Sequence, residues 1–204
     1  PRARRHRDPV LVVKLVVTAV ALVGLAALVT VVVLQDRRDS KRFDAGHQAY
    51  VAADCAVVIA EYDALLDDGR LIDTAGVVAQ ATQERAECRE LLAIDLVAEA
   101  DPAEALSRYA DFVAQHSDAP LSASVGGRVA AMLASSNGIE AASEENCDNL
   151  DAFGVAGILQ SVDVPQFRLW CADTFESVGR GADAYATAVL VLQSATVFEA
   201  LTAA

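Results

Sequence analysis

An apolar run without a single charge, Leu15 to Leu34, constrains this chain more than any other feature of its sequence. The run holds twenty residues, mostly Leu, Val and Ala, and contains no proline that would interrupt a helix. Twenty helical residues rise about 30 Å, which matches the hydrocarbon core of a bilayer. We therefore predict one transmembrane helix over residues 10–35.

A cleaved signal peptide and a buried core helix are the two alternatives to a membrane anchor. The apolar region of a signal peptide spans about 7–15 residues and ends at a small-residue cleavage site. This run is longer and closes with Val31 to Gln35, which offers no such site. A buried helix of that length would be unusual in so small a domain. The anchor divides the chain into a basic tail (1–9), the transmembrane helix (10–35), a juxtamembrane linker (36–45) and an acidic helical domain (46–204).

Lysine and arginine flank both ends of the anchor, so the positive-inside rule gives little preference for either orientation. From Ala45 onward, however, the chain has 25 acidic residues, seven arginines and no lysine, a net charge of −18. The same part has four cysteines without a CxxC pair, which favours disulfides in an oxidising compartment. We therefore expect a single-pass protein of the cell membrane with a cytoplasmic tail and an extracytoplasmic domain. Arginine outnumbers lysine fourteen to two, which indicates a GC-rich bacterial genome.

The cysteines allow three disulfide pairings. Pairing between sequence neighbours, Cys55 with Cys88 and Cys147 with Cys171, would staple each half of the domain. Each bridge would close a loop of about 25–35 residues and stabilise the fold by about 3–4 kcal/mol in the chain-entropy model. A zinc site is the alternative, but it normally needs ligand pairs two to four residues apart, and no two of these cysteines are that close. The sequence therefore favours two disulfides and no metal.

The domain shows the periodicity of helices. Apolar residues recur at spacings of three and four, as in Val58, Tyr62 and Leu65, and no alternating β-branched run persists. Asp101 to Glu104 combines an N-cap acid, a proline at the first helical position and a glutamate at the capping-box position. We expect further helix starts at Asp73-Thr74 and at Asp163 to Pro165. The fold class is therefore all-α.

Three stretches, residues 46–65, 92–112 and 171–191, each pair two helices across a short turn. Ala105 is followed four residues later by Tyr109, and Gly46 and Tyr62 hold comparable places. This pattern resembles the tetratricopeptide repeat (TPR), which implies stacked helical hairpins with a concave face that binds proteins.

The resemblance departs from the family in spacing and in residue type. The matching positions Gly46, Ala93 and Ala172 are 47 and 79 residues apart, whereas the family spaces them by about 34. Val58 replaces the small residue of the first stretch, and no aromatic residue follows Ala184 by four. The alternatives for the hairpin array are thus a TPR-like solenoid and an irregular helical bundle.

No constellation of residues in the sequence argues for catalysis or for a cofactor. His47 and His116 lie in helical segments without a nucleophile elbow or a glycine-rich loop, and we expect them to face solvent. The acids around Gly69 lack the ligand spacing of a calcium loop, and Glu144 to Asp148 reads as a solvated helix start. Trp170, the sole tryptophan, is expected in the core. A domain this acidic should repel nucleic acid, and no small-molecule substrate is evident.

The sequence thus favours a membrane-tethered interaction module, a scaffold or adaptor of the bacterial cell envelope, with protein partners in the membrane or envelope. One alternative is an accessory subunit of a larger membrane complex, in which Ala21, Gly24 and Ala27 would allow close helix packing; another is a cell-envelope hydrolase. We expect partner contacts at polar residues on the first helix of each hairpin, with a shallow salt dependence. Those residues are Gln48, Arg89 and Asp173.

Overall fold

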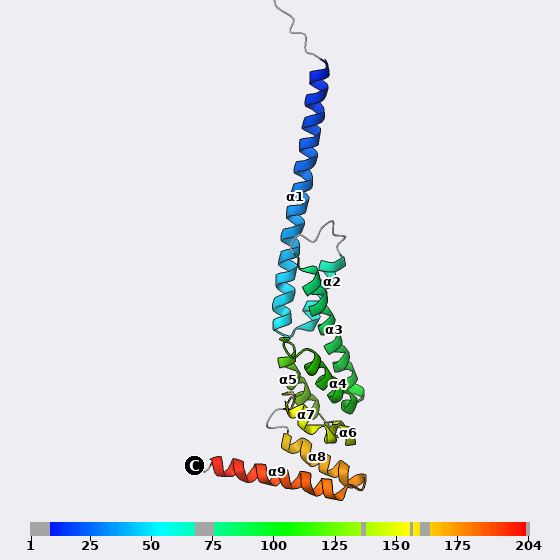
Figure 1. Cartoon of the computed structure of the whole chain (residues 1–204), viewed down its shortest axis with the longest axis vertical. Coiled ribbons are helices and arrows are strands. Elements are labelled where there is room, and N and C mark those ends of the chain that lie inside the picture. Colours follow the sequence, from blue (N-terminus) through cyan, green and yellow to red (C-terminus); the bar gives the residue numbers. More distant parts are fainter. Residues whose placement is uncertain (1–8, 68–75, 136–137, 156, 160–163, 203–204) are drawn as a thin grey trace, which may run out of the picture.

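The computed structural model describes residues 9–67, 76–135, 138–155, 157–159 and 164–202. Within these ranges the regular structure is helical and contains no strand, so the predicted all-α fold is confirmed. In chain order the elements are α1 (Pro9–Val51), α2 (Cys55–Asp67), α3 (Val78–Ala100), α4 (Pro102–Gln115), α5 (Ser122–Leu133), the short 3₁₀ helix η1 (Gly138–Ala141), α6 (Glu144–Asp148), α7 (Leu150–Val155), α8 (Val164–Ser177) and α9 (Gly181–Thr202). Figure 1 shows an elongated molecule with α1 along the long axis and α9 lying across the opposite end.

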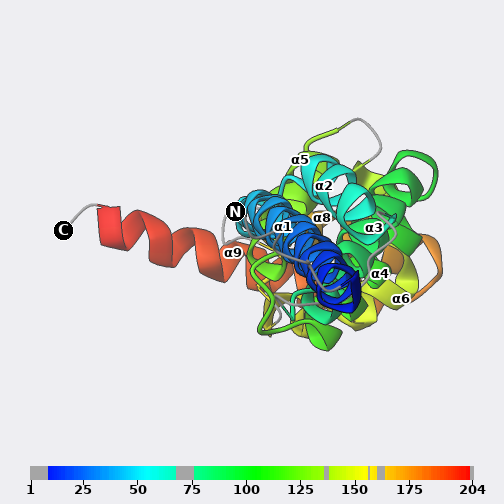
Figure 2. The same ribbon diagram turned by 90° about the horizontal axis from the view of Figure 1, so that it is seen from above.

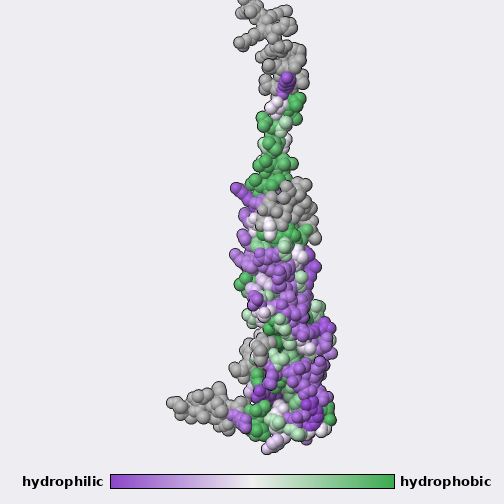
Figure 3. All heavy atoms as spheres, viewed as in Figure 1, coloured by the Kyte–Doolittle hydropathy of each residue, from purple (hydrophilic) through white to green (hydrophobic). Residues whose placement is uncertain are grey.

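Helix α1 joins the apolar run to the domain without a break. It has 43 residues, and its Val17–Val51 stretch contains an 18-residue window with a mean hydropathy of 2.8, no part of which is buried inside the protein. Figure 3 shows this apolar stretch exposed beyond the hydrophilic surface of the domain. The helix is therefore long and apolar enough to cross a membrane. Residues 36–45, expected to form a linker, are helical, because they include neither glycine nor proline.

The last turns of α1 belong to the domain. The Nη1 atom of Arg42 donates a hydrogen bond of 2.6 Å to the carbonyl oxygen of Ala64 on α2. Gly46 allows the two helices to approach closely, because a Cβ atom at this position would overlap the ring of Tyr62. The apolar run and the first helical segment of the domain are therefore parts of one helix, α1, and α2 packs along its last turns.

The three expected hairpins occur as α1–α2, α3–α4 and α8–α9, and the helices of each pair pack against one another. The connections between the hairpins differ: α2 is followed directly by α3, whereas α5, η1, α6 and α7 lie between α4 and α8. The resemblance to a tetratricopeptide repeat stays a prediction. One hydrophobic core runs through the hairpins, from Tyr50 on α1 to Phe175 on α8.

Two of the expected helix starts lie partly outside the described residues. Asp73-Thr74 is not described and α3 begins at Val78, while Asp163 is not described and α8 begins at Val164. The third start is confirmed. A side-chain oxygen of Asp101 accepts a hydrogen bond of 3.0 Å from the backbone N–H of Glu104, and Pro102 opens α4.

The predicted disulfide pairing is the one in the structure. Cys55 at the start of α2 is bonded to Cys88 on α3, with a Cα–Cα distance of 5.0 Å. Cys147 on α6 is bonded to Cys171 on α8, with a Cα–Cα distance of 5.4 Å. All four cysteines are buried, so each bridge crosses the interior between neighbouring helices.

Candidate functional sites

Two carboxylates on α3 are buried in the half of the domain nearer the apolar part of α1. Glu84 is 5% exposed and Glu87 is 4% exposed. They lie on the same face of α3 as the buried residues Ala81, Cys88 and Leu91. Residues at spacings of three and four share one face of a helix, so this is the core face of α3. A buried carboxylate is costly unless hydrogen bonds satisfy it, so the partners of these two side chains decide whether they are strained or stable.

Glu84 is satisfied by side chains from three helices. The hydroxyl of Tyr62 on α2 donates to Oε2 of Glu84 at 2.5 Å, and Nε2 of Gln80, one turn earlier on α3, donates to Oε1 at 2.8 Å. Nδ1 of His47 on α1 lies 2.8 Å from the same Oε1 atom. The ring of Phe43 stacks on both His47 and Tyr62 and covers this group of polar side chains.

Glu87 repeats this arrangement one turn further along α3. The hydroxyl of Tyr50 on α1 donates to Oε2, and Nε2 of Gln83 donates to Oε1 at 2.9 Å. Nδ1 of His116, which follows α4, lies 3.5 Å from Oε1 of Glu87, and the Nε2 atom of His116 lies 3.3 Å from Glu90. The two carboxylates thus connect α3 to α1, to α2 and to the end of α4.

The phenols of this cluster act as hydrogen-bond donors. Burial, followed by the hydrogen bond to Glu84, raises the pKa of Tyr62 above its ordinary value. Burial and the hydrogen bond to Glu87 raise the pKa of Tyr50 in the same direction. Both hydroxyls therefore stay protonated at neutral pH and keep donating to the carboxylates.

A cavity of about 380 Å³ opens beside this cluster, between α3 and the segment after α4. Its lining includes Tyr50, Glu84, Glu87, His116 and Pro120. The carboxylate oxygens that reach it already accept hydrogen bonds from tyrosine and glutamine. Among the described residues no group of histidine, cysteine and acidic side chains has a metal-binding arrangement. The cluster is suited to holding helices together.

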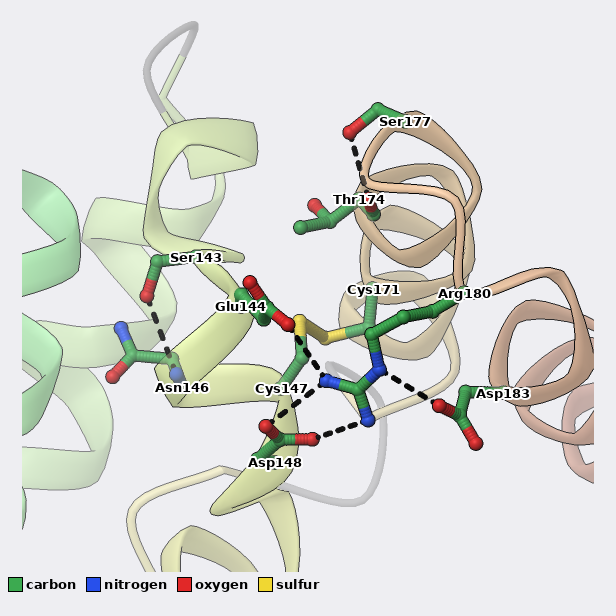
Figure 4. Close-up of polar contacts among 10 residues, drawn as sticks. All are labelled: Ser143, Glu144, Asn146, Cys147, Asp148, Cys171, Thr174, Ser177, Arg180 and Asp183. Atoms are coloured by element: carbon green, nitrogen blue, oxygen red, sulfur yellow. Dashed lines mark hydrogen bonds and ion pairs between the residues drawn. A yellow bond between two sulfur atoms is a disulfide. The ribbon is translucent and has the colours of Figure 1, made fainter.

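Arg180 organises a second polar cluster at the far end of the domain (Figure 4). It follows α8 and donates to Asp183 at 2.7 Å, to Glu144 at 3.0 Å and to both oxygens of Asp148 at 3.0 and 2.9 Å. Its guanidinium also lies 4.3 Å from the ring centre of Phe175. These hydrogen bonds hold the pKa of Asp148 below its ordinary value. Glu144 and Asp148, expected only as part of a solvated helix start, are thus ion-paired beside the Cys147–Cys171 bridge.

An apolar groove lies between α8 and α9, and we call it the distal groove. Its volume is about 680 Å³. Its lining residues are Ile139, Gln166, Leu169, Trp170, Ala172, Asp173, Glu176, Gly181, Ala184, Tyr185 and Ala188. Tyr185 is 74% exposed and Leu169 is 43% exposed. Trp170, expected in the core, is only partly buried: it packs against the core and also lines this groove.

Beyond the distal groove, α9 carries further exposed apolar residues. This helix projects sideways from the body of the domain (Figure 2), and Leu190 and Leu192 on it are exposed. Only two residues of α9 are charged, Asp183 and Glu199. Exposed apolar surface of this extent is typical of sites that bind another molecule.

The structure does not bring the three predicted contact residues together. Gln48 lies exposed on α1, and Arg89 lies on α3, where its Nη2 atom donates to Asp63 at 2.7 Å. Asp173, on α8, lines the distal groove. Spacing along the chain placed each residue on the first helix of a hairpin, but the surface those helices share depends on how the hairpins pack.

The grouping of the two histidines with the two buried glutamates was not predicted from the sequence. His47 and His116, expected to face solvent, each lie beside a buried carboxylate, with 42% and 22% of their side chains exposed. The available signal was the position of Glu84 and Glu87 on an otherwise apolar stripe, with glutamine four residues before each. An acid at a core position predicts a buried partner.

No family model, curated protein or solved structure matches this chain.

Proposed function

We propose that this chain is a single-pass membrane protein whose helical domain lies outside the cytoplasm and binds another protein without catalysing a reaction. The observation that carries the proposal is the distal groove. It exposes apolar side chains, Tyr185 and Leu169 among them, at the end of the molecule opposite the apolar part of α1. A tethered domain that presents its apolar surface away from the membrane is placed to meet a partner.

Two features support the placement of the domain outside the cytoplasm. Both cysteine pairs form disulfides, which persist in oxidising compartments. The net charge of −18 from Ala45 onward disfavours contact with nucleic acid and with anionic lipid. Fusions that follow Ala204 test this orientation in bacterial cells: alkaline phosphatase should be active there, and a green fluorescent protein should stay dark. A fluorescent fusion with inactive phosphatase would reverse the orientation.

The continuity of α1 supports a rigid tether, which would also fix the distance of the distal groove from the membrane. Because α1 runs through the segment 36–45 as helix and packs on α2, the domain should not swing freely about a linker. Inserting a short glycine–serine segment after Asp36 would add that freedom while leaving the domain intact. We expect partner capture to weaken if the partner is itself membrane-bound, because its effective concentration at the groove falls.

A pulldown from solubilised membranes tests the binding function. One variant replaces residues 10–35 with an unrelated apolar helix, and a second carries Leu169→Ser and Tyr185→Ser in the distal groove. Leu96→Ser is the control, because Leu96 is an exposed leucine on α3 that lies outside the groove, at 69% exposure against 43% for Leu169. A partner that survives the anchor replacement and the control but is lost with the groove variant supports the proposal.

The same pulldown distinguishes the accessory-subunit alternative. In that case the transmembrane helix makes the contacts, so the partner is lost when the anchor is replaced and is retained by the groove variant. That result would contradict the interaction-module proposal. Equal retention by every variant would also contradict it, because neither the anchor nor the groove would then be the binding surface.

A further inference from the structure

We propose that the distal groove binds a protein segment that combines an apolar side chain with neighbouring lysine or arginine residues. This inference rests on the proposed binding function and specifies the chemistry of the partner. It is argued from the shape of the groove, from the charge at its rim and from the surroundings of both.

The shape of the groove suits an inserted apolar side chain. Ala184 and Ala188 are four residues apart and therefore lie on the same face of α9, where their small side chains leave space. Trp170 and Leu169 form the opposite wall on α8, and Tyr185 stands at the edge. A volume of about 680 Å³ falls in the ordinary range of ligand pockets. A partner side chain such as Leu or Phe would meet apolar atoms from both helices.

The charge at the rim is negative and uncompensated. Asp173 and Glu176 line the groove from α8, three residues apart, and both are exposed. Neither forms an ion pair within the described part of the chain. The arginine that follows this helix, Arg180, is already bound to Glu144, Asp148 and Asp183. The groove therefore presents two carboxylates beside an apolar floor, and a lysine or arginine near the inserted side chain would complement them.

The same charges argue against other occupants. A second copy of this chain would bring another acidic domain, with a net charge of −18, against the rim. An anionic lipid surface would meet the same repulsion. The exposed Leu192 lies eight residues after Ala184 and four after Ala188, so it continues the apolar face of the groove along α9 and gives the partner segment room to extend. An amphipathic helix or extended segment of a basic protein satisfies all of these conditions.

The sole tryptophan of the chain lies in this groove, which makes binding directly measurable. The full chain in dodecyl maltoside is titrated with a helical peptide of about 14 residues, built from Leu at three–four spacing and Lys elsewhere. A second peptide carries Glu in place of every Lys. The Lys peptide should change the emission of Trp170 to saturation, and the Glu peptide should not. Partition of the peptide into micelles is equal for all protein variants and cancels in their comparison.

Two charge variants decide whether the rim acids matter. The double variant Asp173→Asn with Glu176→Gln should bind the Lys peptide about tenfold more weakly, since each exposed ion pair contributes a modest free energy of binding. Asp111→Asn with Glu99→Gln removes the same charge from exposed sites on α4 and α3 and should change the affinity less than about twofold. Equal losses in both variants would show that diffuse negative charge drives binding. Equal affinity for the Glu peptide, or no saturable change with either peptide, would also overturn the inference.

These results separate the inference from the proposed function. If the pulldown finds a partner that depends on Leu169 and Tyr185 but not on Asp173 and Glu176, the binding function stands and the basic-partner inference fails. If the Lys peptide binds at the rim but no partner from membranes depends on the groove, the proposed function fails. Raising the ionic strength should lower the affinity for the Lys peptide only moderately, because two carboxylates contribute to binding and the charge of the whole domain does not.

Discussion

The two ends of the domain, one beside the apolar part of α1 and the other at the distal groove, use their polar and apolar residues in opposite ways. Beside the apolar part of α1, Glu84 and Glu87 are buried and satisfied by tyrosine, glutamine and histidine. At the distal end the ion pairs of Arg180 lie near the surface, and the apolar side chains of Leu169 and Tyr185 are exposed. At the first end the polar groups hold helices together, whereas at the second end apolar surface stays exposed.

The two ends nevertheless share a construction. Each has one hairpin, α1–α2 or α8–α9, and each has one disulfide that joins a hairpin to a neighbouring helix. The difference in exposure therefore does not come from a lack of cross-links at the distal end. It comes from α9, which projects beyond the helices that cover α8 (Figure 2).

The largest effect should follow from Glu84→Ala. This change leaves Tyr62, Gln80 and His47 without their shared acceptor in a buried site, so we expect a loss of about 3–5 kcal/mol in the free energy of unfolding. Denaturant unfolding followed by circular dichroism measures it. Glu84→Gln should cost less, because an amide oxygen still accepts. Glu99→Ala on the same helix is the exposed control, at about 0.5 kcal/mol or less.

A loss no larger for Glu84→Ala than for Glu99→Ala would contradict the comparison between the two ends. It would mean that the buried carboxylate contributes nothing beyond filling space, and that the hydrogen bonds around it are offset by the cost of its burial.

The disulfides should have smaller and nearly equal effects. The bridges span sequence separations of 33 and 24 residues, and the chain-entropy model gives about 3–4 kcal/mol for either. Cys55→Ser with Cys88→Ser, and Cys147→Ser with Cys171→Ser, should therefore lower the stability alike. Only Cys147→Ser with Cys171→Ser should also weaken binding of the Lys peptide to the distal groove, because Cys171 lies on α8 beside Trp170.

Peptide mapping without reduction checks the disulfide comparison directly. It should link the peptides of Cys55 and Cys88 and those of Cys147 and Cys171. Four free thiols, or a link from Cys55 to Cys171, would contradict the structure at both ends.

The parts of the fold that local sequence determines were predictable. The length of the apolar run from Leu15 specified α1 as a candidate membrane helix, and Asp101 with Pro102 specified the start of α4. Gly179 and Gly181 flank the short turn that separates α8 from α9. In each case the responsible residues are adjacent in sequence, and backbone chemistry decides the outcome.

The candidate sites were not predictable, because residues from distant segments form them. The position of Glu84 on an apolar stripe indicates that it is buried, but it does not identify its partners His47 and Tyr62, which are 37 and 22 residues away. Trp170 reads as a core residue from its apolar neighbours, and the direction of α9 leaves it at the edge of a groove. Spacing predicts which side of a helix is apolar, but it does not predict whether a neighbour covers that side.

Arg180→Gln should have a smaller effect that depends on pH. Arg180 holds the pKa of Asp148 below its ordinary value of 3.8, so the folded carboxylate binds its proton less readily than the unfolded one. The stabilisation is thus present above that value and is lost as the pH falls through the lowered pKa. Wild type should melt higher than Arg180→Gln at neutral pH, and the gap should close in acid.

Arg108→Gln is the matched control for Arg180, because Arg108 forms a single exposed pair with Glu104 at 2.7 Å. Its melting temperature should change little at any pH, since isolated surface pairs contribute about 0.5 kcal/mol or less. If both variants behaved alike, the four hydrogen bonds of Arg180 would act as ordinary surface contacts and would not anchor the distal hairpin.

The smallest effects should come from the two hairpin turns, which have the same backbone geometry and different residues. In the first turn Asp54 N–H bonds to Ala49 and Ala53 N–H bonds to Tyr50; in the second, Arg180 N–H bonds to Phe175 and Gly179 N–H bonds to Glu176. This pair of bonds is the Schellman motif, which needs a left-handed residue after the helix. Ala53 has a φ of 57° and Gly179 has a φ of 82°.

Because only glycine adopts this conformation without strain, exchanging the residues should have opposite effects. Ala53→Gly should stabilise the domain by about 0.5–1 kcal/mol. It removes the strain of an alanine in the left-handed conformation, and the entropy that glycine adds to the unfolded chain offsets part of this gain. Gly179→Ala should destabilise it by about 1 kcal/mol, and only through the backbone, because a Cβ atom at Gly179 meets nothing within 4 Å. Thermal melting of both variants measures the signs. Destabilisation by Ala53→Gly would show that the first turn is not held in the left-handed conformation, and the equivalence of the two hairpins would fail at that residue.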